Sequence, residues 1–201
     1  MTANPFPRRA EPDVRRQGLI AACTRVLARE GAAGTSVRVI AREAGISPGL
    51  ITHYFAGIDA LISATYDHVD QTVAAAMAQA VDAAGSDPRA RLDAFVTASF
   101  APPIADRALL ATWIAFWSLV TARPDIARQH DDQYAAYRAR LTELLAACGV
   151  RCDHLRLAAI SVTALVDGLW LELCLSPGCF TGTEAGVIAR AHIDALLTRR
   201  A

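Results

Sequence analysis

The stretch GAAGTSVRVIAREAGISPGLITHYF, residues 31–55, decides the fold of the N-terminal part of the chain. It contains two short segments with helical periodicity, and only Gly45 and Ile46 separate them. A glycine directly after the last apolar residue of a helix commonly ends that helix, because it adopts the left-handed conformation without strain. Two short helices joined by so tight a turn predict a helix-turn-helix.

Capping residues support both helices. Thr35 or Ser36 precedes the first helix, where a side-chain oxygen can accept a free backbone N–H. Ser47 precedes the second helix and Pro48 occupies its first position, where the missing N–H of proline has no cost. We therefore expect a short second helix from Pro48 to about Phe55.

Outside this stretch, helical periodicity continues almost everywhere and strand-like alternation is hard to find, which predicts an all-α protein of about nine helices. We expect an N-terminal three-helix domain over residues 1–58, with a flexible arm at 1–11, and a larger helical domain over 59–201. The remaining seven helices are expected at Pro12–Glu30, Asp59–Ala84, Pro88–Phe100, Ala105–Ala122, Pro124–Cys148, Cys152–Leu175 and Thr183–Thr198.

Composition sets the location that we expect. The 201 residues are 53% hydrophobic and 20% charged, so a packed core is expected rather than long disorder. Met1–Ala10 has the pattern of neither a secretory signal nor a transit peptide. The most membrane-like segment, Leu155–Leu175, contains Asp167 and Glu172, which are costly in a bilayer. We expect a cytoplasmic protein without membrane contact, in which this segment is a buried interface helix.

The sequence predicts no cofactor, no metal site and no enzyme activity. Its five cysteines are an odd number without a secretion signal, which favours reduced thiols. Cys148, Cys152 and His154 lie close together, but the second ligand pair of a zinc site is missing. Glycine-rich phosphate loops and the HExxH and GxSxG motifs are also missing. An all-helical small-molecule-binding protein or enzyme without DNA binding is kept as the alternative.

Charge and side-chain type in the helix-turn-helix point toward nucleic acid. Residues 1–66 hold eight arginines and five acids, a net charge of +3, whereas the remainder carries −3. Gly49, Thr52 and His53 are small or polar and would lie where a helix approaches base edges. The hydroxyls of Ser36, Ser47 and Tyr54 could bind phosphates. The competing interpretation is a purely structural three-helix packing in which Thr52 and His53 are only solvated.

The 31–55 stretch resembles the signature of TetR-type repressors: a glycine, a Thr/Ser cap, an Ile-Ala pair, Ala-Gly-Val-Ser (Ala-Gly-Ile-Ser in this chain), a short recognition helix and a closing aromatic pair. The resemblance implies DNA binding. It places Arg38 at a position from which some family members contact a base. One departure is Ile58, where the family usually has a lysine that contacts a phosphate. The residues expected to contact DNA are Ser36, Arg38, Ser47, Pro48, Gly49, Thr52, His53 and Tyr54.

Two aromatic segments, TWIAFWSLVTARP (112–124) and LVDGLWLELCLSPG (165–178), contain all three tryptophans. Trp113 and Trp117 are four residues apart and share a helical face. Ordinary core packing is one interpretation. The other is a site for an organic cation, because aromatic faces with a nearby carboxylate hold a quaternary ammonium group.

The same segments resemble the C-terminal domain of BetI-type, choline-responsive repressors, through the FW before a proline and the DGLWL run. This resemblance implies a small-molecule effector, with choline or a related cation as one candidate. The residues expected in the effector pocket are Trp113, Phe116, Trp117, Asp167, Trp170 and Glu172.

The last two long helices, Cys152–Leu175 and Thr183–Thr198, are too apolar to face solvent. We expect them to pair with a symmetry mate in a four-helix interface. A homodimer would present two recognition helices to palindromic double-stranded operator DNA.

Overall fold

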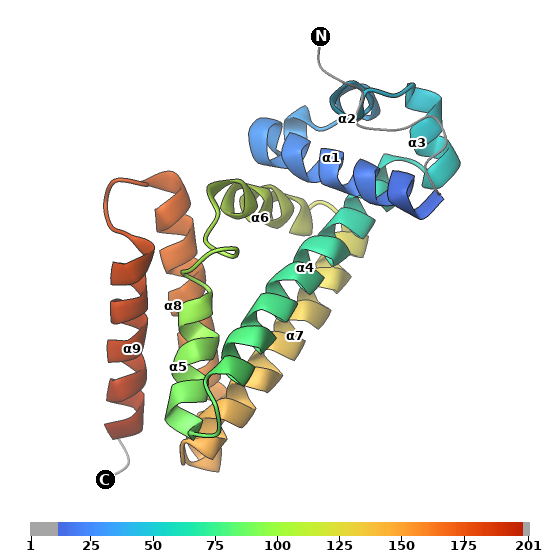
Figure 1. Cartoon of the computed structure of the whole chain (residues 1–201). Coiled ribbons are helices and arrows are strands. Elements are labelled where there is room, and N and C mark those ends of the chain that lie inside the picture. The colour runs from blue at the N-terminus through green and yellow to red at the C-terminus, as the bar shows by residue number, and fades with distance from the viewer. Residues whose placement is uncertain (1–11, 199–201) are drawn as a thin grey trace. The chain divides into compact units, whose positions relative to one another are not determined.

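The structure is a computed structural model and describes residues 12–198, so the arm expected at 1–11 lies outside the described residues. Within this range the chain forms nine α-helices and no strand (Figure 1). The all-α prediction is thereby confirmed. The helices are α1 (Pro12–Gly34), α2 (Val37–Ala44), α3 (Pro48–Tyr54), α4 (Ile58–Ala83), α5 (Pro88–Ala98), α6 (Arg107–Val120), α7 (Pro124–Ala147), α8 (Cys152–Leu175) and α9 (Gly182–Thr198).

The chain divides into two compact units. The first contains the residues up to Asp70 together with Ala111–Gln129, and the second contains Gln71–Leu110 and the residues from His130 onward. Helices α4, α6 and α7 therefore contribute residues to both units. The domain boundary expected after residue 58 stays a prediction.

In the first unit, α1 buries one continuous apolar face. The stripe that periodicity predicts on this helix is buried throughout, with exposed fractions of 4% or less. Its members are Leu19, Ile20, Cys23, Val26 and Leu27. Burial raises the pKa of the Cys23 thiol to about 11, so this cysteine is a protonated core residue rather than a reactive one.

The end of α1 differs from the expectation. The helix was expected to stop at Gly31, but it continues to Gly34 after a kink at Gly31, whose φ is 66°. Thr35 accounts for the extra turn, since its hydroxyl donates to the Gly31 carbonyl (2.7 Å) and its N–H to the Ala32 carbonyl (3.2 Å). The glycine thus bends the helix before the following turn ends it.

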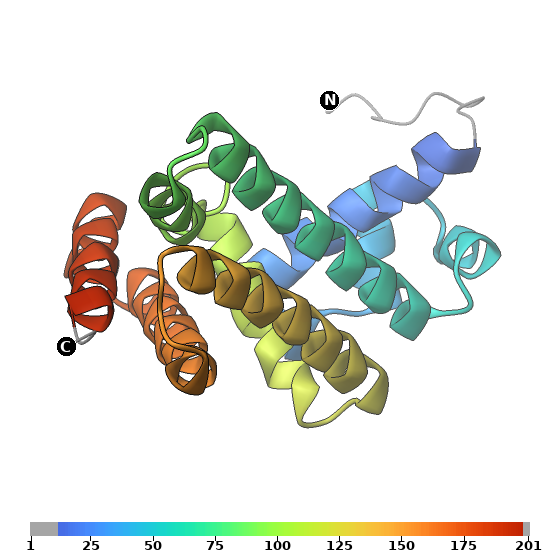
Figure 2. The same cartoon turned by 90° about the horizontal axis from the view of Figure 1, so that it is seen from below.

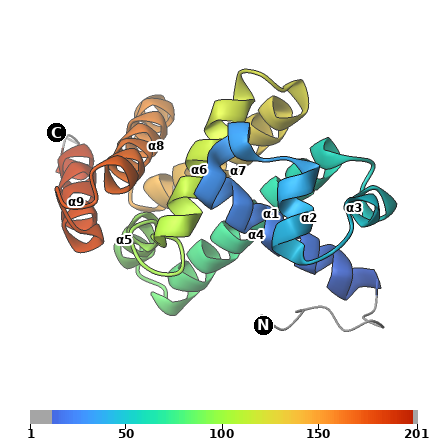
Figure 3. The same ribbon diagram turned by 90° about the horizontal axis from the view of Figure 1, so that it is seen from above.

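The turn between α2 and α3 has the expected geometry. Gly45 adopts a left-handed conformation (φ 66°, ψ 33°), and its N–H donates to carbonyls in the last turn of α2. The Ser36 hydroxyl caps the start of α2 by accepting from the Val39 N–H at 3.4 Å. Figure 3 shows α1 and α2 side by side, with the short turn leading on to α3.

Polar contacts hold the start of α7 against the start of α4 within the first unit. Arg123 forms ion pairs with Asp59 (2.8 Å) and Asp125 (2.6 Å). One turn into α7, the Gln129 side chain accepts a hydrogen bond from the Ser63 hydroxyl at 3.0 Å and donates to Asp67 at 2.7 Å. These contacts join α7 to the first turns of α4.

In the second unit, α8 and α9 pack side by side and α5 also contacts α9 (Figure 2). Arg89 on α5 joins these helices through an ion pair with Asp194 on α9 at 2.7 Å. The start of α9 needs a glycine, because a side chain at Gly182 would collide with the carbonyl of Phe100. Helix α8 is long and apolar enough to cross a membrane, but the core or interface helix of a soluble protein has the same length and composition.

Candidate functional site

The helix-turn-helix is held together by its own buried and charged contacts. Glu43 on α2 accepts hydrogen bonds from Arg25 (2.7 Å) and Arg29 (3.0 Å) on α1. The bond from Arg25, with a further contribution from Arg29, keeps the pKa of Glu43 below its usual range. Two of the arginines in the positively charged N-terminal third are therefore engaged within the protein.

Helix α3 is anchored by one face. Ile51 is fully buried and Phe55, just after the helix, is 5% exposed. The guanidinium of Arg16 on α1 lies 4.5 Å from the centre of the Phe55 ring, a cation–π contact. Together these contacts fix which face of α3 points outward.

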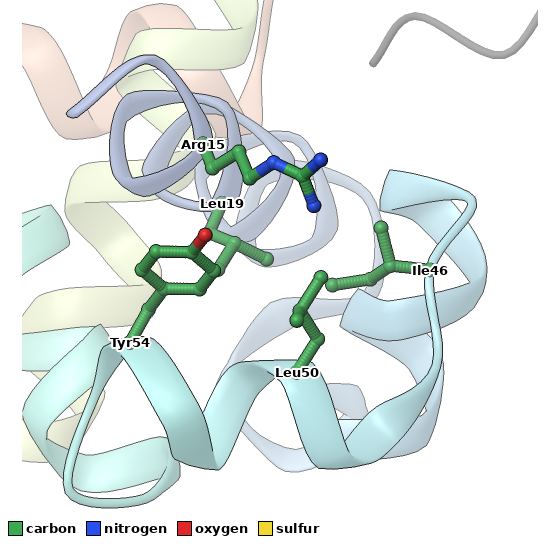
Figure 4. Close-up of a pocket in the computed structure, with 5 residues that line it drawn as sticks. All are labelled: Arg15, Leu19, Ile46, Leu50 and Tyr54. Carbon is green, nitrogen blue, oxygen red and sulfur yellow. The ribbon is translucent and has the colours of Figure 1, made fainter. Parts of the chain in front are cut away.

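A small hollow lies between α1 and α3. It is lined by Arg15, Leu19, Ile46, Leu50 and Tyr54. In Figure 4 the side chains of Leu50 and Ile46 converge on Leu19, with the Tyr54 ring beside them and Arg15 at the rim. Three of the five lining side chains, those of Leu19, Ile46 and Leu50, are apolar.

The residues expected to contact DNA lie on the outer surface of this unit. Seven of the eight are exposed, and Tyr54 is half-buried. The exposed ones are Ser36, Arg38, Ser47, Pro48, Gly49, Thr52 and His53. Their exposure is compatible with the predicted contact with DNA.

Gly49 has no structural reason to be a glycine. Its φ is not positive, and a Cβ added there would find no atom within 4 Å. Nearby, the Thr52 hydroxyl donates to the Gly49 carbonyl at 2.8 Å, which leaves the hydroxyl oxygen able to accept from outside. The first turn of α3 is thus smooth and open toward solvent.

Ser47 occupies the N-cap position of α3 but makes no side-chain capping bond. This differs from the expectation that its hydroxyl would cap the helix, whereas the Ser36 hydroxyl does cap α2. The hydroxyl of Ser47 is exposed beside the first N–H groups of α3.

Two exposed arginines on α2 are not used internally. Arg38 and Arg42 are four residues apart, so they share a face of α2, and no ion pair among residues 12–198 includes either of them. Arg42 was not among the residues expected from the sequence. The signal available in the sequence was its spacing of four residues from Arg38, which places two mutually repelling positive charges on one helix face.

Ile58 begins α4 at the position where a lysine was expected. Arg123 brings a positive charge close to the start of this helix. Asp59 and Asp125 both pair with it, so Arg123 adds no net positive charge that would replace the missing lysine.

The six residues expected to bind an effector fall in different units. Trp113, Phe116 and Trp117 belong to the first. Trp113 and Phe116 are 3% and 0% exposed, and both pack against Tyr66 with ring-centre distances of 5.4 and 4.8 Å. This arrangement is a well-packed aromatic core.

The other three expected residues lie on α8 in the second unit and differ in how far they are buried: Asp167, Trp170 and Glu172. Trp170 is 7% exposed, and its indole N–H donates to the Ser99 carbonyl at 2.7 Å. Asp167 is half-buried, whereas Glu172 is exposed. Of these two acids, only Asp167 is partly buried within the unit.

A polar and aromatic cluster surrounds Asp167. The Tyr134 hydroxyl on α7 donates to its carboxylate at 3.1 Å. The Tyr134 ring in turn lies 4.2 Å from the His130 ring and 5.8 Å from the Arg138 guanidinium. Burial raises the pKa of Asp167 to about 6, against the opposing effects of Tyr134 and Arg138.

Tyr137 completes this cluster from the next turn of α7. Its ring packs on Phe95 of α5 at 5.1 Å, and burial, reinforced by the charge of Asp167, raises the pKa of its hydroxyl. The buried hydroxyl oxygens of Ser99 and Tyr137 lie near each other, but neither completes a hydrogen bond of good geometry within the described residues. Tyr134, Tyr137 and Ser99 were not predicted from the sequence, because no local pattern links them to Asp167.

No group of three or more metal-binding side chains occurs in the described part of the chain. The five cysteines, all within residues 12–198, form no disulfide.

Two family models match the chain. The model described as "Bacterial regulatory proteins, tetR family" matches residues 19–65. The model described as "BetI-type transcriptional repressor, C-terminal" matches residues 88–198. Together they cover the helix-turn-helix and most of the remaining helices.

Curated relatives are similar over nearly the whole chain. The HTH-type transcriptional regulator BetI of Burkholderia thailandensis is 37% identical over 98% of this chain and 100% of its own length. The protein of the same name from Paraburkholderia phymatum is 35% identical, with the same coverage.

Solved structures agree with this similarity. A protein from Pseudomonas aeruginosa PAO1, assigned as a transcriptional regulator, superposes with a TM-score of 0.85 at 42% identity, covering 94% of this chain and 93% of that one. A regulator structure from Saccharomonospora viridis, solved in complex with choline, has a TM-score of 0.78 at 21% identity, covering 90% and 96%.

Proposed function

The chain belongs to the TetR family of bacterial transcriptional regulators and carries a BetI-type repressor C-terminal domain, and we propose that it binds a palindromic operator as a homodimer and switches on binding a small molecule. The enzyme alternative is set aside, because the relatives are named transcriptional regulators. Such a regulator would act in the cytoplasm, where its operator is accessible.

In this proposal α3 enters the major groove, and Gly49, Thr52 and His53 approach the base edges. The observation that carries it is the open surface at Gly49, where a glycine lies in a helix without any internal need for one. A glycine in a helix destabilises it by about 0.5–1 kcal/mol relative to alanine. Close approach of a partner surface would explain why the residue is there.

The phosphate contacts would surround this helix. Ser36, Ser47 and Tyr54 supply hydroxyls, while Arg38 and Arg42 supply positive charges from α2. Pro48 would shape the N-terminus of α3. With Ile58 in place of a lysine, the two arginines of α2 would carry more of the phosphate binding, and the affinity would depend strongly on salt.

The dimer would form through α8 and α9. Large apolar side chains are exposed on both helices, with exposed fractions from 37% to 65%. They are Leu157, Ile160, Leu171, Leu175, Val187 and Ile188. On α8 successive members are separated by about one, three and one helical turns, so they form one stripe, as in a helix that packs against another.

Gly168 lies in the middle of this stripe, exposed and with nothing within 4 Å of an added Cβ. A second copy of α8 crossing there could approach its backbone closely, with Leu171 and Leu157 packing on either side. Burying each large apolar side chain would contribute about 1.5–3 kcal/mol. A second copy of this chain is the partner that we propose for the stripe.

The effector would be an organic cation, with choline as the first candidate because the S. viridis regulator was solved with it. Of the residues expected to bind it, Asp167 and Trp170 on α8 lie one turn apart in the second unit and are the candidates for this role. Ring faces and a carboxylate are the groups that hold such a cation.

Fluorescence polarisation with the DNA upstream of the protein's own gene tests the proposal. We expect a salt-dependent shift that requires both halves of a palindrome and changes when choline is added. Absence of binding at low salt, on DNA that contains the flanking intergenic regions, would reject the regulator function.

A further inference from the structure

We propose that Arg16, near the start of α1, binds a phosphate of the DNA backbone beside the C-terminal end of α3. Arg16 lies outside the 31–55 stretch and was not among the residues expected to contact DNA. The inference rests on the proposed binding of α3 in the major groove, and it adds a contact from a helix outside the helix-turn-helix stretch.

The structure brings Arg16 against the end of α3. Its guanidinium carbon lies 4.5 Å from the centre of the ring of Phe55, the residue directly after this helix. The neighbouring Arg15 lines the hollow between α1 and α3 together with Tyr54, the last residue of α3 (Figure 4). The start of α1 therefore places two arginines beside the C-terminal end of α3.

The contact with Phe55 leaves the donors of Arg16 available. A cation–π contact needs no N–H of the guanidinium, whose five donors lie around the edge of its plane. Arg16 is exposed and has no ion-pair partner within residues 12–198, whereas Phe55 is 5% exposed and forms a fixed platform. An arginine positioned in this way presents a preorganised fork to a phosphate, which it can bind through two N–H groups.

The other charged residues of α1 show why this arginine is different. Arg25 and Arg29 both pair with Glu43 and hold α2 in place. Asp13 lies three residues before Arg16, close enough on a helix to pair with it, but the two form no ion pair. Covering the Phe55 ring would need only the aliphatic part of a long side chain, so the covering role does not account for the charge.

The place of this charge fits a helix inserted in the major groove, because a phosphate backbone runs along each edge of the groove. Arg38 and Arg42 supply positive charge from α2, which precedes α3. Residues 55–60, which follow α3, contain no lysine or arginine. Arg16 thus supplies a positive charge at the end of α3 where the chain that follows supplies none.

Fluorescence polarisation with the DNA upstream of the protein's own gene tests the phosphate contact. In Arg16→Gln we expect affinity to fall at least about fivefold, and the slope of log affinity against log salt to fall by about 1. Arg16→Lys keeps the charge but loses the fork, so affinity should fall while the slope stays at the wild-type value. Arg140→Gln, at an exposed arginine of α7, is the matched control and should change neither quantity.

Ethylation interference on the same DNA then locates the contact. An ethylated phosphate has lost its charge, so each phosphate that the wild type needs appears as a position where ethylation prevents binding. We expect Arg16→Gln to become insensitive at one such phosphate in each half of the palindrome and to keep the others. A purely structural role of Arg16 would lower thermal stability, which circular dichroism measures, but would not remove a single phosphate from the pattern.

A wild-type salt slope together with a wild-type interference pattern in Arg16→Gln would overturn the inference. If Arg16→Gln does not fold, Arg16→Met decides, because methionine can still cover the Phe55 ring but carries no charge. Absence of binding by the wild type at low salt would overturn the regulator function and this inference with it. Equal binding by the wild type and the uncharged variants would overturn this inference alone.

Discussion

At residue 49 a glycine stands in a seven-residue helix although the protein has room there for a side chain. Asp167 is a comparable case, because it is a half-buried carboxylate with only a tyrosine as hydrogen-bond partner. Both residues make the isolated fold less stable than an obvious substitute would. At each position we therefore propose that binding, rather than folding, accounts for the residue.

Gly49→Ala separates the two explanations at that position. We expect unchanged or slightly increased thermal stability, because alanine favours helix, and a loss of operator affinity of about tenfold from the added methyl group. Gly178→Ala, at another exposed glycine with open space around its Cβ, is the control. Undiminished operator affinity in Gly49→Ala would mean that this surface does not touch DNA.

Asp167→Asn is expected to stabilise the free protein in a pH-dependent manner. Burial raises the pKa of Asp167 from 3.8 to about 6, so ionisation costs the folded state and wild-type stability falls as pH rises through this window. The variant should match the wild type near pH 4 and exceed it by at most about 3 kcal/mol at pH 8.

Urea unfolding of both proteins across that range measures the difference in stability. His130, whose pKa burial lowers, titrates in both proteins and largely cancels in the comparison. A variant that is no more stable than wild type at pH 8 would show that Asp167 is not penalised by burial.

At the scale of single elements, the charged residues of α2 lie on two different faces of the helix. Glu43 faces α1 and pairs with Arg25 and Arg29, which fixes the helix in place. Arg38 and Arg42 share an exposed face and have no ion-pair partner within residues 12–198. One face of α2 is thus held against α1 by ion pairs, and another face is exposed and positively charged.

We expect Arg38→Gln and Arg42→Gln each to weaken operator binding and to lower the slope of log affinity against log salt by about 1, because each removes one phosphate contact. Polarisation titrations at four salt concentrations measure this slope. Arg140→Gln, at an exposed arginine of α7 that pairs with Glu143, should leave it unchanged. An unaltered slope in Arg42→Gln would remove this arginine from the interface.

At the scale of the whole molecule, regulation by the proposed mechanism requires two copies. The apolar stripe along α8, with Gly168 at its centre, is the surface that a second copy would cover. A symmetric dimer explains why one recognition helix per chain can suffice for a palindrome.

Glutamate at both Leu157 and Leu171 should convert the protein to a monomer on analytical ultracentrifugation, since charges would be buried in the interface. Affinity for the full palindrome should then fall about 100-fold or more, to the level of a half-site, because the two heads no longer act together. Ala136→Glu on the exposed face of α7 is the control. A double variant that remains dimeric would place the interface elsewhere.

Local signals in the sequence were sufficient for the all-α class, the nine helices of the described range, the left-handed Gly45 and the Ser36 cap, because caps and periodicity act over four residues or fewer. The 31–55 motif likewise sufficed for the family. Only the tertiary structure showed that Arg25 and Arg29 both pair with Glu43. It also showed that Asp167 is half-buried whereas Glu172 is exposed. Tyr134, Tyr137 and Ser99 gather near Asp167 only in the folded chain. These contacts bring together residues from separate helices, and the register in which helices pack depends on every side chain between them rather than on any local pattern.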